Sequence, residues 1–207
     1  MLQPLPLTRS PRSSVPTALF GKGSENPVQK LQADLYTIGW VSWWSQVILS
    51  TVSGVTLLFA NSVTGTISTF SLVGRALAIG GLGCSVASTL WALGYARLAR
   101  NVGKKGLAAD DAASRTLGRV GFGMTLNLFG MALCLLGAEA IVGTLAAKAL
   151  TQSSGLVVGA GTNPIQALDV LIVQANTNTI ASHFVSLLCG MRLRGAASQC
   201  TSASAKA

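Results

Sequence analysis

Four long apolar stretches constrain the fold of this chain more than any other feature of its sequence. A helix needs about 20 apolar residues to cross the hydrocarbon core of a bilayer. Stretches near residues 40–61, 72–96, 120–147 and 165–191 meet that length. Only 10% of the residues are charged, against about 25% in soluble domains. We therefore expect an all-α integral membrane bundle of four transmembrane helices.

The sequence around these stretches divides the chain into three parts. Residues 1–25 carry arginines but no acid before Glu25, which is typical of a flexible or transit-peptide-like tail. Residues 26–194 hold the membrane domain, and residues 195–207 are expected to be a flexible C-terminal tail. Apolar residues at helical spacing over 28–38 predict an amphipathic helix on the membrane surface. A tryptophan cluster then marks the interface where the first span begins: Trp40, Trp43 and Trp44.

Lysine and arginine concentrate on one side of the predicted membrane. They lie before the first span, within the link between the second and third spans, and at the end of the fourth span. The link over 61–71 has no charge, and the next outer link has only Lys148. The positive-inside rule therefore predicts that both termini face the stromal or cytoplasmic side, with Arg75 as an exception. The net charge of +9 is not arranged as a continuous basic stripe, so we do not expect nucleic-acid binding.

Small and polar residues recur along one face of the third apolar stretch. Helices in lipid associate through small residues and interhelical hydrogen bonds. We expect the following residues to form a packing seam against neighbouring helices: Gly123, Asn127, Gly130, Cys134 and Gly137. The four cysteines of the chain include no C-x-x-C pair, so we expect them to act as small buried apolar residues.

The run VQANTNTIASHF in the fourth stretch is unusually polar for a membrane helix. Its candidate functional stripe comprises Asp169, Gln174, Asn176, Asn178, Thr179 and His183. One interpretation is structural: these side chains would hydrogen-bond to neighbouring helices, with His183 as a neutral donor. The other is functional, because ionisable residues within a membrane often mark a transport path. In that case Asp169, His183 and Glu139 of the third stretch are the candidate metal ligands.

Two segments of the chain resemble a known family. The segments IGWVSWWSQVILSTVSGVTLLFA and NPIQALDVLIVQANTNTIASHFVSLL are similar to the family of the chloroplast inner-envelope translocon's twenty-one-kilodalton subunit, also called permease in chloroplasts. The likeness covers roughly residues 28–194. It implies four helices in a plastid or cyanobacterial membrane, with the inner envelope expected and the thylakoid as the alternative. It implies two roles, protein import and iron transport, and no catalytic residues.

Three functions follow from these observations. The first is a translocon-associated subunit whose partners are lipid, other membrane subunits and further copies of itself. The second is an iron permease, in which iron is the transported ion and oligomerisation is expected because four helices are few for a carrier. The third is an accessory structural subunit of a photosynthetic membrane complex. G-x-S-x-G, H-E-x-x-H and P-loop motifs are absent from the sequence, so we expect neither an enzyme nor a catalytic cofactor.

Overall fold

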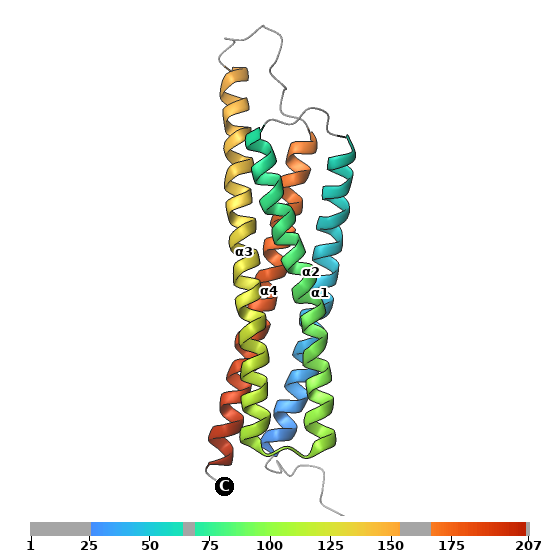
Figure 1. The fold of residues 1–207 in the computed structure, drawn as a ribbon, viewed down its shortest axis with the longest axis vertical. Coiled ribbons are helices and arrows are strands. Elements are labelled where there is room, and N and C mark those ends of the chain that lie inside the picture. The colour runs from blue at the N-terminus through green and yellow to red at the C-terminus, as the bar shows by residue number, and fades with distance from the viewer. Residues whose placement is uncertain (1–25, 64–68, 154–166, 206–207) are drawn as a thin grey trace, which may run out of the picture.

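The protein is an antiparallel bundle of long helices, in a computed structural model that describes residues 26–63, 69–153 and 167–205. Its elements are α1 (Pro27–Val63), α2 (Thr69–Lys105), α3 (Ala109–Ser153) and α4 (Ala167–Ser204). Each helix packs against the next in sequence, and α4 packs against α1, which closes the bundle (Figure 1). The shortest helices have 37 residues and are about 55 Å long at 1.5 Å per residue. They therefore extend well beyond a hydrocarbon core of about 30 Å.

Side-chain burial in this bundle is the reverse of that in a soluble protein. Serine, threonine, amide and imidazole side chains are buried, whereas large apolar side chains face outward on each described helix. Leu58 on α1, Leu90 on α2, Leu136 on α3 and Phe184 on α4 are all more than half exposed. Apolar surface is unfavourable in water. An outer surface of this kind is therefore suited to lipid.

Three of the helices in the described ranges are long and apolar enough to cross a membrane: α1, α2 and α3. The fourth, α4, has a similar length of 38 residues. Its apolar content is lower because polar side chains such as Asn176, Thr179 and His183 occupy its buried face. The prediction of an all-α bundle with four helices is confirmed, and the membrane spans are assigned by composition for three of them.

One end of the bundle contains an apolar core. At this end α1 begins, α2 turns into α3, and α4 ends (Figure 1). Leu31 and Leu35 of α1 are buried there together with Val102 of α2 and Leu193 and Ala197 of α4. We call this part the basic end, because it also carries most of the lysine and arginine side chains of the described helices.

The prediction of a separate surface helix over 28–38 is wrong. These residues form the first turns of α1 and continue without interruption into the first predicted span. On a surface helix the apolar side chains of Leu31 and Leu35 would point into lipid. Here they pack against the neighbouring helices of the basic end. Gly39 does not break the helix. A Cβ atom at this position would lie 3.0 Å from Tyr95 Cβ, so glycine allows α1 and α2 to approach closely.

The predicted C-terminal tail and middle link are also mostly helical. α4 continues to Ser204, because Ala197 and Cys200 are buried in the apolar core of the basic end. Burial raises the pKa of the Cys200 thiol, and the nearby carboxylate of Asp110 raises it further. The connection from α2 to α3 is a short turn in which Gly106 adopts a φ of +55°, a common helix cap for glycine. The predicted tail over 1–25 lies outside the described residues.

Candidate functional site

A layer of hydroxyl groups joins α1, α2 and α4 inside the bundle. Ser50, Ser85 and Ser182 come from these three helices, and each is buried. The Oγ atom of Ser50 is 2.6 Å from that of Ser85 and 3.3 Å from that of Ser182. The Ser85 and Ser182 Oγ atoms are 2.9 Å apart. One turn further along α1, Ser53 Oγ lies 2.6 Å from Thr179 Oγ1. A hydroxyl both donates and accepts, so these groups satisfy one another within the protein.

His183 lies at the centre of a second network, which joins α2, α3 and α4. Its Nδ1 atom is 2.9 Å from Asn127 Oδ1, and its Nε2 atom is 3.1 Å from the backbone oxygen of Gly81. Both partners are carbonyl oxygens, which only accept, so a neutral imidazole, with one N–H, can donate to one of them at a time. Ser88 Oγ donates to Asn127 Oδ1 at 2.9 Å, and Asn127 Nδ2 donates to Ser186 Oγ at 2.9 Å. Asn127 therefore connects three helices through one carboxamide.

Small residues on α3 allow its backbone to approach these polar side chains. A Cβ atom at Gly130 would overlap the imidazole ring of His183 and lie 2.7 Å from Cys84 Cβ. Asn176 Nδ2 reaches across from α4 and donates to the backbone oxygen of Cys134 at 2.8 Å. The residues that the sequence assigned to the α3 packing seam are all buried between helices: Gly123, Asn127, Gly130, Cys134 and Gly137.

The candidate stripe on α4 divides into an inner and an outer part. Asn176, Thr179 and His183 are spaced by three and four residues, which places them on one face of the helix. All three are buried in the networks described above. Gln174 is exposed and Asn178 is partly exposed, and the Gln174 Nε2 atom donates to Asn178 Oδ1 at 3.2 Å along their own helix. The structure therefore does not bring these two residues together with the inner group.

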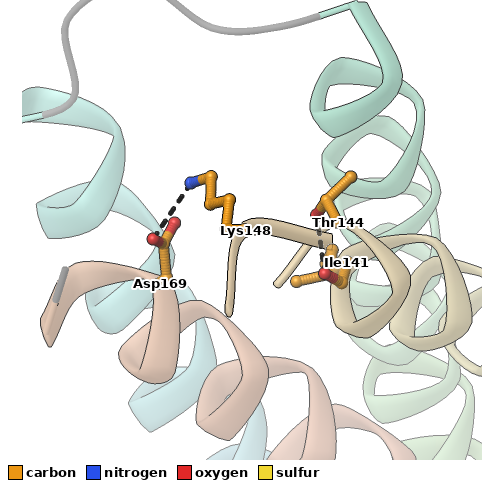
Figure 2. A network of polar contacts seen from close by, with 4 residues as sticks. All are labelled: Ile141, Thr144, Lys148 and Asp169. Atoms are coloured by element: carbon orange, nitrogen blue, oxygen red, sulfur yellow. Dashed lines mark hydrogen bonds and ion pairs between the residues drawn. The ribbon is translucent and has the colours of Figure 1, made fainter. Parts of the chain in front are cut away.

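The acidic candidates lie apart from the inner network. Asp169, near the start of α4, forms an ion pair with Lys148 of α3 at 3.2 Å (Figure 2). Glu139 is exposed on α3. Within the described ranges, no three His, Cys, Asp or Glu side chains gather where they could hold a metal ion. His183, Asp169 and Glu139 thus do not form a common set of ligands there.

Two parts of the site were not assigned by the sequence. Ser50 was not among the candidates, although Ser42, Gln46, Ser50 and Ser53 follow one another at spacings of four, four and three, which is a helical face. Asn127 was assigned only to packing, because its partner His183 is 56 residues away in the chain. The spacing on α1 is a signal that sequence reasoning could have used, whereas the pairing of Asn127 with His183 depends on how the helices dock.

Comparison with known proteins identifies relatives of the chain. Residues 25–195 match the family described as "Protein of unknown function (DUF3611)". "Protein TIC 21, chloroplastic" from Arabidopsis thaliana is 36% identical over 164 residues, which cover 75% of this chain and 54% of that protein. The chain therefore spans about half the length of the curated relative that it matches. No solved structure matches it.

Proposed function

This chain belongs to the DUF3611 family, and we propose that it is a membrane subunit acting in protein import across the inner envelope of plastids. The proposal is supported by the 36% identity to the chloroplast TIC protein and by the resemblance of its tryptophan-rich and polar segments to the inner-envelope translocon family. Its working environment is a plastid membrane, with the basic end on the stromal side.

In this proposal α4 is the fourth membrane span. It packs against both α1 and α3 along the bundle, so it crosses the same layer of lipid as they do. Its inner polar side chains do not meet lipid, because they are bonded to the other helices. Its outer face includes the exposed side chains of Val170, Phe184 and Met191. The backbone N–H and C=O groups of each helix then form hydrogen bonds within that helix, as the interior of a bilayer requires.

The bundle acts in the assembly as a scaffold and not as a conduit for the imported chain. The observation that carries this role is the closed polar core, in which His183, Asn127, Ser88 and Ser186 bond to one another. An extended polypeptide passing between the helices would have to replace these bonds and separate the close contact at Gly130. The exposed apolar surface remains available to other membrane subunits.

Site-specific photocrosslinking in isolated chloroplasts tests this role. A photoreactive phenylalanine analogue would replace Phe59, Phe129 or Phe184, one exposed residue on each of α1, α3 and α4. These changes keep an aromatic ring at a surface position, so the fold is preserved. We expect at least one position to capture another envelope protein in plastids that are importing a precursor. Tyr36 is the matched control, because it is exposed on α1 near the basic end, outside the predicted spans.

Depletion of the chain supplies the functional measurement. Plastids with reduced amounts of the protein should import a radiolabelled precursor more slowly, and restoring the chain should restore the rate. The proposal is wrong if import is unchanged on depletion and the chain migrates as a lone particle in mild detergent without crosslinked partners. Crosslinks from these outward positions mainly to the moving precursor would instead favour direct contact with cargo.

A further inference from the structure

The guanidinium group of Arg119 is held in a fixed position between α2 and α3 at the basic end. The Cζ atom of Arg119 is 4.9 Å from the centre of the Trp91 ring, which is a favourable distance for a cation–π contact. Trp91 Nε1 donates to the backbone oxygen of Arg119 at 3.0 Å, so the two residues fix each other. A Cβ atom at Gly94 would overlap the Arg119 guanidinium. The bare backbone of Gly94 therefore makes room for it.

This guanidinium has no anionic partner within the described part of the chain. The ion pair found there joins Lys148 to Asp169 and does not involve Arg119. The Nε atom of Arg119 is buried without a hydrogen-bond partner. An arginine carries five donors and keeps its charge at any physiological pH. Because this Nε atom is enclosed by protein, an anion from outside the chain would have to reach the terminal nitrogens of the guanidinium, which belongs to a half-buried side chain.

The surroundings of Arg119 are basic on one side and apolar on the other. Arg115 is four residues before it and on the same face of α3, and Arg97 is three residues after Gly94 on α2. Both are exposed. The nearest aspartate along α3 is Asp111, about 12 Å away along the helix axis. In the opposite direction the exposed ring of Phe122 packs on Trp91, with ring centroids 4.4 Å apart.

We propose that Arg119, with Trp91, Gly94 and the neighbouring arginines, binds the phosphate of an anionic lipid headgroup. The position suits a lipid because Arg119 lies where the apolar stretch of α3 begins, and tryptophan prefers the headgroup level of a membrane. The phosphate would meet the guanidinium while an acyl chain runs along Phe122. A planar guanidinium bonds well to phosphate oxygens. An acidic peptide would leave the exposed aromatic surface beside the charge unused.

Native mass spectrometry of the purified full chain tests this site. The protein would be released from nanodiscs containing equal amounts of phosphatidylglycerol and phosphatidylcholine, and the retained lipids would be counted. We expect the chain to retain phosphatidylglycerol preferentially and Arg119→Gln to lower that retention about tenfold, the size of one charge-assisted hydrogen bond. Arg194→Gln is the matched control, because Arg194 is an exposed arginine of α4 at the same end. It should retain the lipid like the unaltered chain.

Two further measurements keep the proposal falsifiable. In a chain with Trp40, Trp43 and Trp44 replaced by phenylalanine, the remaining Trp91 should be quenched more strongly by brominated phosphatidylglycerol than by brominated phosphatidylcholine. This measurement does not require the Arg119 variant to fold. Equal quenching by both lipids, or equal loss of lipid in the Arg119 and Arg194 variants, would overturn the site. Displacement of the lipid by millimolar inorganic phosphate would show a site for free anions and would also overturn it.

Discussion

Replacement of Asn127 by leucine is the most informative change to the polar core. Asn127 makes three interhelical contacts through its side chain: with Ser88, with Ser186 and with His183. Leucine has the same number of side-chain heavy atoms in the same branching pattern but cannot form these contacts. Interhelical hydrogen bonds in membrane proteins contribute about 0.6 kcal/mol each on average. Three of them amount to about 2 kcal/mol, or roughly a 30-fold change in the unfolding equilibrium.

Additional loss is expected because the former partners remain buried. A buried donor or acceptor left without a partner costs about 1–3 kcal/mol, so a total destabilisation of about 3–5 kcal/mol is expected. Reversible unfolding in mixed micelles of increasing SDS content, followed by tryptophan fluorescence, measures it. Asn178→Leu is the control, since Asn178 bonds only to Gln174 of its own helix among the described residues. If the two variants unfold at the same SDS fraction, the network does not stabilise the bundle and this reasoning is refuted.

Three other expectations follow from the same structure. Gly130→Ala should destabilise the bundle by about 1–3 kcal/mol, since the added methyl overlaps the buried imidazole. Gly143→Ala is its control, because nothing lies within 4 Å of a Cβ atom there, and it should leave the SDS midpoint unchanged or slightly raised. Lys148→Gln should change the unfolding free energy by less than about 1 kcal/mol, because its ion pair with Asp169 is partly exposed; a larger loss would mean that the pair is better shielded than described. Burial raises the pKa of the Cys200 thiol, so less thiolate is present at neutral pH. Maleimide should therefore label it slowly at pH 7 and faster as the pH rises, and equal rates in the folded and SDS-unfolded chain would contradict this.

The sequence was sufficient for the helical architecture and for the packing face of α3. The lengths of the apolar stretches predict the helices. The spacing of Gly123, Gly130 and Gly137 predicts a face that packs closely. The sequence could not predict how far the helices extend beyond the bilayer. Apolar residues at helical spacing, such as Leu31 and Leu35, look the same on a surface helix and in a bundle core. Only the presence of α2 and α4 beside them decides between the two.

The candidate site was predictable as a set of stripes but not as a network. Helical spacing separates Asn176 and His183 from Gln174, but it does not tell which stripe faces protein. That depends on the docking of α4 against α2 and α3, which brings His183 to Gly81 and Asn127. Asp169 is seven residues before Asn176 and therefore lies near the same face of α4, yet its ion pair with Lys148 is a separate contact (Figure 2).

The central claim is that the polar side chains of α4 are bonded inside a closed bundle and do not line an aqueous path. Ser182 tests it most directly, because its hydroxyl lies in the buried layer with Ser50 and Ser85 and cysteine is a close substitute in size. The chain would carry Ser182→Cys as its single cysteine and would be treated in proteoliposomes with a charged, water-soluble methanethiosulfonate reagent. We predict no labelling of the folded protein and complete labelling after SDS unfolding. Rapid labelling of the folded protein would contradict the closed core and favour a transport path through the bundle.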